Sequence, residues 1–298
     1  MELRQLEYLV AVVEEASFTR AAQRVHVSQS GVSAQVRQLE KELGQQLLDR
    51  SGRTVRVTEA GAAVLPYARA ALAAVVGSRQ AVDELEGLVR GRVRVGMVTA
   101  CTITVLFDQL ADFRARHPGV EIALGEDTSD HLIEGVRSGR LDLALVAWSG
   151  ELPAELGCHV LADERIVAGV PHGDPLARRR AIGFRALHEQ PIVSMLRGTG
   201  VRTAFDSACA ATGLRSRVAI EASAPDAVAG LAARGLGVAV LTESMLDAHS
   251  ADLHALAIVE PELRASLGLI WRTDSPANPA TRVLVEHARS RFAAALAE

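Results

Sequence analysis

The stretch from Ser17 to Arg37 places the strongest constraint on what this chain can fold into. Ser17 stands where its hydroxyl can accept a hydrogen bond from a backbone N–H in the first turn of a helix. Apolar residues follow at helical spacing, and a turn then leads to a second capping serine, Ser28. The next helix has one apolar side, made by Val32, Val36 and Leu39. Two short helices joined by a tight turn predict a helix-turn-helix.

The outer side of the second helix offers short or hydrogen-bonding groups, and no acid occurs between Ser28 and Gln38. Amide, hydroxyl and guanidinium groups can read the base edges of a major groove. We therefore predict that this helix contacts DNA through Ser28, Gln29, Ser30, Ser33, Gln35 and Arg37. The alternative is an ordinary solvated helix face, which a short motif does not exclude.

Charge neither favours nor excludes nucleic acid as a partner. The 298 residues carry a net charge of -4, but screening makes the local distribution more important than the sum. The stretch Asp49–Val57 predicts a hairpin with its turn at Ser51-Gly52. A small basic hairpin after a helix-turn-helix is a wing, and we expect its side chains to reach phosphates or the minor groove. Those side chains are Arg50, Arg53 and Arg56.

The segment FTRAAQRVHVSQSGVSAQVRQLEKELGQQLLDRSGRTVRVTEAG resembles the winged helix-turn-helix of LysR-type transcriptional regulators, and the rest of the chain continues in the order of that family. The resemblance implies a regulator that binds double-stranded DNA at an inverted repeat and responds to a small-molecule effector. It also implies a homodimer or homotetramer, with RNA polymerase as a partner if the protein is an activator. Ala34 stands where the family often has arginine, and Leu48 where it often has phenylalanine.

Residues 59–89 predict a long, alanine-rich helix between the two main parts of the chain. A heptad-like row runs along it, formed by Leu65, Ala68, Leu72, Val75 and Val82. One interpretation is a helix that packs only on its own domain. The resemblance implies instead a linker helix that pairs with its copy in a second subunit, which would place two recognition helices about one DNA turn apart.

Beyond the linker, strands alternate with helices in two successive sets, a pattern typical of a mostly parallel α/β sheet with ligands at the carboxyl ends of the strands. We expect a DNA-binding domain at 1–58 and an effector domain at 90–298. Its two lobes would be 90–161 with 265–298, and 162–264. The predicted fold is therefore an all-α winged helix-turn-helix, a linker helix and a two-lobed, type II periplasmic-binding-protein-like α/β domain, as the resemblance also implies.

The candidate effector-binding residues all follow predicted strands. In the first lobe they are Thr99, Ala100, Cys101, Thr102, Thr128, Ser129 and Trp148, and in the second Arg197, Gly198, Thr199 and Ser223. Hydroxyls and backbone N–H groups at helix starts can hold an anion, and Arg197 would suit a carboxylate. We therefore expect an anionic or polar metabolite. The alternative is that these serines and threonines are ordinary helix caps.

Three other classes of function compete with this interpretation. The sequence has no P-loop, GxSxG, HExxH or paired-cysteine motif, so we expect no catalytic residues, no metal and no cofactor. A plain solute-binding protein is disfavoured by the helix-turn-helix. Redox sensing would need a reactive thiol, and Cys209 has no partner nearby in the sequence. Charged residues near Met1 and the absence of a long apolar run lead us to expect a cytoplasmic protein without a membrane segment.

Overall fold

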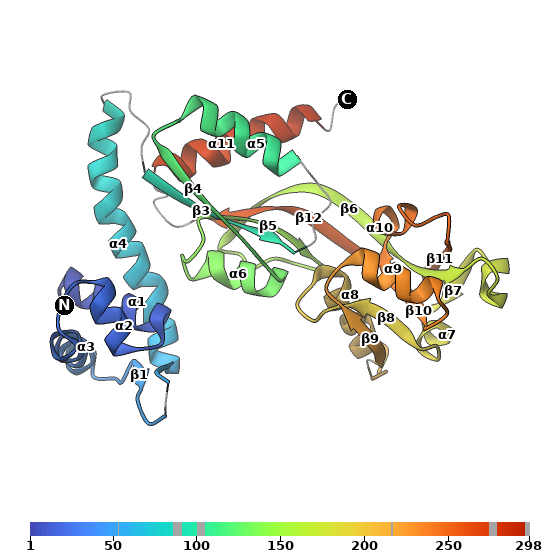
Figure 1. The fold of residues 1–298 in the computed structure, drawn as a ribbon, viewed down its shortest axis with the longest axis horizontal. Helices are drawn as coiled ribbons and strands as arrows, with labels where there is room; N and C mark the ends of the chain where they lie inside the picture. The colour runs from blue at the N-terminus through green and yellow to red at the C-terminus, as the bar shows by residue number, and fades with distance from the viewer. Residues whose placement is uncertain (53, 86–90, 100–104, 216, 274–278, 296–298) are drawn as a thin grey trace.

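The structure is a computed structural model of all 298 residues, and it describes the chain apart from residues 53, 86–90, 100–104, 216, 274–278 and 296–298. Three helices and a hairpin lie at one end, beside the long helix α4 (Figure 1). A two-lobed sheet with helices on its faces extends from α4 to the far end. The predicted fold class is confirmed.

The DNA-binding domain begins with α1 (Leu3–Glu15), α2 (Phe18–Arg24) and α3 (Gln29–Leu43). The predicted caps are present: the Ser17 and Ser28 hydroxyls accept hydrogen bonds from the N–H groups of Arg20 and Gly31, three residues later. Gly44 ends α3 in the left-handed conformation that favours glycine. The predicted apolar side of α3 is fully buried against α1 and α2. These contacts fix the orientation of α3 and leave its opposite side in solvent.

The wing is a short hairpin in which β1 (Leu48–Asp49) pairs antiparallel with β2 (Arg56–Val57). Glu40, in the last turns of α3, joins it to the helix. Its carboxylate accepts hydrogen bonds from the N–H groups of Leu47 and Leu48, at 3.0 and 3.2 Å. The wing therefore cannot turn independently of the recognition helix.

The linker helix α4 (Glu59–Leu85) packs its first half on the DNA-binding domain of its own chain. Leu65 and Ala68 retain only 7% and 2% of their exposed area. These two members of the predicted pairing row are thus core residues of their own subunit and cannot be buried further by a partner. Gly61 is required at the start of α4, because a Cβ there would lie 2.1 Å from the Leu47 carbonyl oxygen.

One segment of α4, Glu59–Ser78, is long and apolar enough to cross a membrane by length and composition, with a mean hydropathy of 1.5. The sequence interpretation had expected no such stretch. Several of its apolar side chains pack in the core of the DNA-binding domain, and Arg69 within it is buried. Only 22% of that segment is buried inside the chain, so packing within the subunit accounts for part of the apolar character of α4.

Lobe 1 contains three parallel strands with helices on both faces, as the alternating pattern predicts. Its elements are β3 (Gly91–Val98), α5 (Val105–Arg116), β4 (Val120–Asp127), α6 (Ser129–Arg137), β5 (Leu143–Trp148) and α11 (Pro279–Ala295).

Lobe 2 is built around β8, β9 and β10, with β11 pairing between β6 and β7. Its elements are η1 (Pro175–Arg178), β7 (Ala181–Gly183), α7 (Phe184–His188), β8 (Ile192–Met195), α8 (Gly200–Ala211), β9 (Val218–Ala222), α9 (Pro225–Ala233), β10 (Val238–Thr242), α10 (Glu243–Asp247) and β11 (Leu253–Val259).

Two long antiparallel strands carry the chain between the lobes. They are β6 (Leu156–Pro171) and β12 (Leu263–Arg272), which pair along the whole length of β12. The sheet is consequently continuous, in the order β4-β3-β5-β12-β6-β10-β8-β9. The predicted lobe boundaries at 161/162 and 264/265 fall inside these two strands.

Candidate functional site

The outer side of α3 presents a small, neutral to basic surface to solvent. Gln29, Ser30, Ala34 and Arg37 are exposed along it, and Ser33 is half-buried at its edge. The Arg37 guanidinium lies along its own helix, with Nε 3.2 Å from the Ser33 carbonyl oxygen. A solvated face of amide, hydroxyl and guanidinium groups matches what a major groove accepts.

Two residues predicted to contact DNA have other roles in the structure. The Ser28 hydroxyl is the cap of α3 and also lies 3.2 Å from the Ser30 hydroxyl, so its hydrogen-bonding capacity is largely used within the protein. Gln35 lies on the flank of α3 that lines a groove with Leu3 and α4, and is not among the exposed group. The helical register separates Gln35 from Gln29 and Ser30, and the sequence pattern alone did not show which flank faces α4.

The wing arginines also differ from one another. Arg50 Nη2 forms an ion pair with Glu40 at 2.6 Å, and its guanidinium lies 5.0 Å from the centre of the Phe18 ring. Arg50 is therefore primarily a brace between wing, α3 and α2. Arg56 is exposed on β2, opposite Asp49, and remains available to a phosphate. Arg53 lies outside the described residues.

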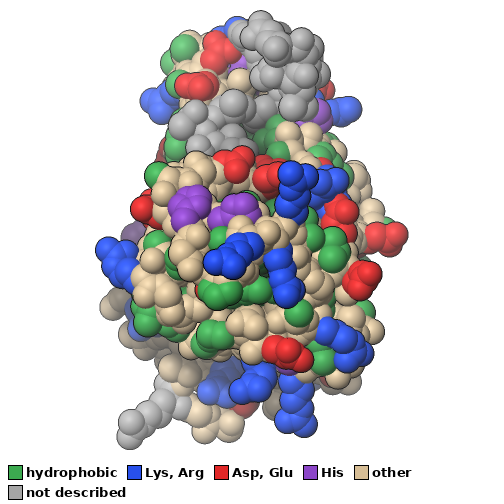
Figure 2. Space-filling model, turned by 90° about the vertical axis from the view of Figure 1, so that its right-hand side faces the viewer, with side chains coloured by type: hydrophobic (Ala, Val, Ile, Leu, Met, Phe, Trp, Pro, Cys, Tyr) green, Lys and Arg blue, Asp and Glu red, His purple; other side chains and the backbone are tan. Residues whose placement is uncertain are grey.

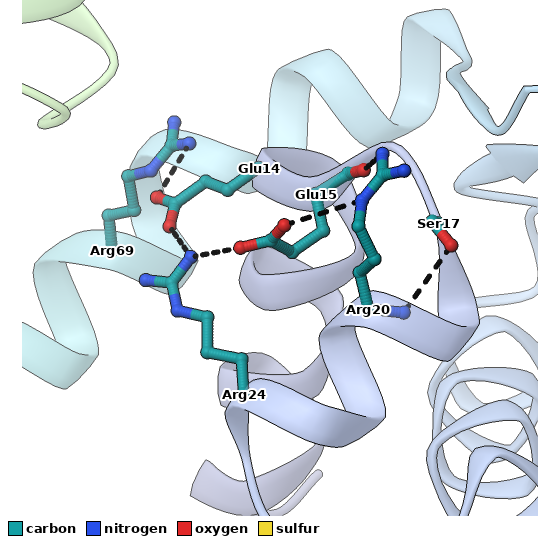
Figure 3. Close-up of polar contacts among 6 residues, drawn as sticks. All are labelled: Glu14, Glu15, Ser17, Arg20, Arg24 and Arg69. Atoms are coloured by element: carbon teal, nitrogen blue, oxygen red, sulfur yellow. Dashed lines mark hydrogen bonds and ion pairs between the residues drawn. The ribbon is translucent and has the colours of Figure 1, made fainter.

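A chain of ion pairs joins α4 to the helix-turn-helix (Figure 3). Arg69 Nη2 lies 3.4 Å from Glu14 Oε1, and Arg24 Nη1 lies 2.7 Å from Glu14 Oε2. Glu15 contacts both Arg24 and Arg20, at 3.4 and 3.6 Å. Arg69 Nη1 also donates to the Ser138 carbonyl oxygen of lobe 1, at 3.2 Å. Sequence reasoning missed this connection, since ion pairs between distant segments leave no local pattern.

A cavity of about 80 Å³ lies between the two lobes. Hydroxyl-bearing residues from both lobes and from the crossing strands line it together with apolar side chains. The described lining consists of Val98, Thr99, Ala147, Ala162, Glu164, Met195, Thr199, Gly200, Val201, Thr242, Ser244, Met245, Ala265, Ser266 and Leu267. The space admits only a small ligand while the lobes stand as they do.

Two of the predicted effector-binding residues, Thr99 and Thr199, line this cavity. The Thr199 hydroxyl also caps α8 by accepting from the Arg202 N–H, so the interpretation as a cap applies to it as well. Ala100, Cys101 and Thr102 lie outside the described residues.

Other predicted residues hold the two lobes together or pack within one of them. The Gly198 carbonyl oxygen accepts a hydrogen bond from the Asp130 N–H, at 3.1 Å, and a Cβ at Gly198 would lie 3.2 Å from the Thr128 hydroxyl. The buried Ser129 hydroxyl accepts from the Ala147 N–H, which fixes the start of α6 to β5. Trp148 is a core residue of lobe 1.

The described lining of the interlobe cavity contains no positively charged side chain that would attract an anionic effector. Arg197 and Ser223 are exposed and do not line the cavity. Arg202, in the first turn of α8, is buried and paired with Asp206 and Glu221, at 3.0 and 2.6 Å. The charged group in the described lining is instead Glu164, whose Oε2 accepts from the Ser244 N–H at 3.1 Å.

An exposed groove runs along the second half of α4. It is lined by Gln35, Leu72, Val75 and Val76 together with the first residues of α1. Val75 and Val76 are 41% and 52% exposed, and Leu72 is partly buried against the DNA-binding core. The side chain of Val82 lies outside what the structure describes. Leu65, Ala68 and Leu72 of the predicted row therefore pack within the subunit, and Val75 is its one described member that is exposed.

The two described cysteines have different surroundings. Cys209 is 1% exposed, and burial together with the nearby Asp206 carboxylate raises the pKa of its thiol, which disfavours the reactive thiolate. Cys158 is an exposed free thiol. In the described part of the chain, no three His, Cys, Asp or Glu side chains converge on a metal position.

The far end of lobe 2 mixes basic, acidic and apolar side chains, with no continuous basic surface among the described residues on that face (Figure 2).

A winged helix-turn-helix joined by a long helix to a two-lobed domain with an interlobe cavity defines a ligand-responsive, DNA-binding regulator. The family description "Bacterial regulatory helix-turn-helix protein, lysR family" matches residues 3–62, and "LysR substrate binding domain" matches residues 86–293. The chain therefore belongs to the LysR family of transcriptional regulators.

Individual relatives agree over nearly the whole chain. The RuBisCO operon transcriptional regulator of Allochromatium vinosum is 34% identical over 81% of this chain and 80% of its own length. The transcriptional dual regulator GltC of Bacillus subtilis is 31% identical over 91% of this chain and 90% of its own. A full-length OxyR variant from Pseudomonas aeruginosa, 25% identical, has a TM-score of 0.70 over 97% of this chain and 95% of its own.

Substituting a base-reading residue and substituting a phosphate-binding residue should change DNA binding in different ways. Gln29→Ala should reduce discrimination between operator and mutated operator by about 1–3 kcal/mol, because an amide can read two atoms of one base edge. Arg56→Gln should weaken binding to all sequences alike and lower the salt slope by about one, because it removes a phosphate contact. Fluorescence anisotropy over a salt series measures both. If the two variants changed affinity and specificity in the same way, this division of roles would be wrong.

Proposed function

We propose that the protein is a sequence-specific transcriptional regulator whose grip on an inverted-repeat operator is set by a small ligand bound between its lobes. Residues 1–58 would bind DNA, 59–89 would link and pair the subunits, and 90–298 would bind the ligand. The observation that carries this proposal is the solvated face of α3, held firmly beside a wing and joined through α4 to a domain with an interlobe cavity. A regulator of this kind acts in the cytoplasm, and performs no catalysis.

We infer that the ligand is small and mainly apolar, with a hydrogen-bond donor. Met195, Val201 and Leu267 provide apolar contact, and the hydroxyls around them can orient a polar group. The Glu164 carboxylate accepts hydrogen bonds only, so it favours an ammonium, hydroxyl or amide group on the ligand. A simple carboxylate placed against Glu164 would be repelled.

Helix α6 offers a physical route from the cavity to the DNA-binding domain. Its first turn contacts lobe 2 through the Asp130–Gly198 hydrogen bond, and its C-terminal carbonyl at Ser138 receives the Arg69 guanidinium. Movement of lobe 2 on ligand binding would shift α6 as a rigid body and change its contact with Arg69. Two arrangements of this contact, biased by the ligand, would be a population shift.

We propose a homodimer formed through the second half of α4. The exposed Val75 and Val76, with Met1 and Leu3 beside them, leave an apolar strip that a second α4 can cover. The charged residues Glu2, Arg4 and Glu7 line the rest of the groove. RNA polymerase becomes a further partner if the protein activates transcription.

Glu164→Gln should separate ligands by their chemistry. Calorimetry on the full-length protein with a panel of small amines, alcohols and carboxylates should find a ligand with a donor group. The substitution should weaken that ligand at least tenfold, because an amide replaces the charge that receives the donor. Glu189→Gln, an exposed position in lobe 2, is the matched control. Preferential binding of simple carboxylates, unaffected by Glu164→Gln, would refute this ligand class.

Val76→Glu should convert the protein to a monomer, because a charge would replace an apolar side chain at the proposed contact between the two α4 helices. Multi-angle light scattering measures the mass, and operator affinity should fall because two half-sites can no longer be bound together. Tyr67→Glu changes a 78% exposed residue of the same helix and should leave the dimer intact. A Val76→Glu protein that remains dimeric would show that the subunits meet elsewhere.

A further inference from the structure

A second cavity, of about 510 Å³, lies between the linker helix and lobe 1. Arg69, Ala70 and Ala73 of α4 form one wall. The turn after α6, the end of β12 and one side of α11 form the others, and α4 runs beside this part of lobe 1 (Figure 1). Its described lining shares no residue with that of the interlobe cavity. A molecule bound here would touch the linker helix and the effector domain at once.

Guanidinium groups dominate the described lining of this cavity. They belong to Arg69, Arg94, Arg272, Arg282 and Arg289, whereas the acids are Asp142 and Glu286. The Asp142 carboxylate is engaged by Arg94, with Nε and Nη2 at 3.1 and 3.2 Å from its two oxygens. Five arginines against two acids give the described lining an excess of positive charge. Arginine suits bidentate binding of carboxylates and phosphates better than lysine does.

Arg69 has an incomplete set of hydrogen-bond partners. Its side chain is 7% exposed, Nη1 donates to Ser138 and Nη2 reaches Glu14. Its Nε is buried and has no acceptor among the described residues. Burial, together with the positive charges of Arg140 and Arg94, lowers the pKa of Arg69. A buried donor without an acceptor is unfavourable, and an anion in the cavity would reduce the repulsion between Arg69 and the neighbouring arginines.

The apolar part of the lining favours an organic ligand over an inorganic ion. Leu141, Val285 and Trp271 supply apolar surface, and the Arg289 guanidinium lies 5.9 Å from the centre of the Trp271 ring. The volume lies within the range of small-molecule sites and exceeds the needs of an inorganic ion.

We propose that this cavity binds an organic polyanion, either a di- or tricarboxylate or a phosphate ester, as a second effector site. Because the ligand would contact Arg69 and lobe 1 together, it would strengthen the link between α4 and the effector domain. The site adds a function to the regulator proposed above and does not depend on the identity of the ligand between the lobes.

The test is calorimetry on the full-length protein at constant ionic strength, with citrate, glucose 6-phosphate and acetate as probes. The wild type should bind citrate or glucose 6-phosphate, and which one binds identifies the chemical source of the anion. The double substitution Arg282→Gln and Arg289→Gln, on the solvent side of α11, should weaken that probe at least tenfold. Arg234→Gln, at an exposed arginine that caps the C-terminus of α9, removes a positive charge outside the cavity lining and should bind as the wild type does.

Three results would overturn the proposal. These are no binding of citrate or glucose 6-phosphate, equal binding by the wild type and the double variant, or acetate binding as tightly as either polyanion. If circular dichroism shows that the double variant folds poorly, the affinities of the single variants Arg282→Gln and Arg289→Gln for the same probe are measured instead. Operator binding without any probe is measured separately, so that failure of the regulator function remains distinguishable from failure of this site.

Discussion

The buried Arg69 guanidinium is the interaction on which the arrangement of the two halves depends. A cation with 7% exposure is tolerated only where acceptors surround it. Its acceptors come from both sides of the linker: Glu14 of the DNA-binding domain and the Ser138 carbonyl at the C-terminal end of α6. The partial negative charge at that helix end adds to the attraction. One side chain on α4 therefore holds both domains against the same helix.

This contact connects the DNA-binding domain to the lobe that lines the interlobe cavity. The ion pairs Glu14–Arg24 and Glu15–Arg20 continue from Arg69 into the helix that precedes the recognition helix (Figure 3). On the other side, α6 reaches back to the interlobe contact at Gly198. Gly200 allows the start of α8 to pack against β5, because a Cβ there would lie 2.8 Å from the Ala147 backbone. The arginine-lined cavity lies directly along this path, which is why an anion there would act on coupling rather than on either site alone.

Local chemistry allowed much of the fold to be predicted, and tertiary packing explains the rest. The caps at Ser17 and Ser28 and the end of α3 at Gly44 depend on nearby backbone groups, so the sequence indicates them directly. The first half of β6 carries His159, Asp163 and Glu164. Because these residues are polar, the sequence pattern did not predict the part of the strand that crosses between the lobes. Glu164 of the cavity was missed for the same reason, and Ser266 was missed because β12 begins four residues before the strand expected from Leu267. The heptad row on α4 showed that the helix has an apolar face, but it did not show which residues that face packs against. Arg197 follows a strand, as predicted, but its position in the sequence did not show that its side chain is exposed.

Hydrogen exchange on full-length protein carrying Arg69→Met tests the central claim most directly. Methionine keeps the long apolar stem and removes the charge shared by the two domains. The account predicts faster amide exchange on both sides of the contact, at the C-terminal end of α6 and at the end of α1, with lobe 2 unchanged. Unaltered exchange in α6 would contradict it, because the effector domain would then not depend on Arg69 for its contact with the linker.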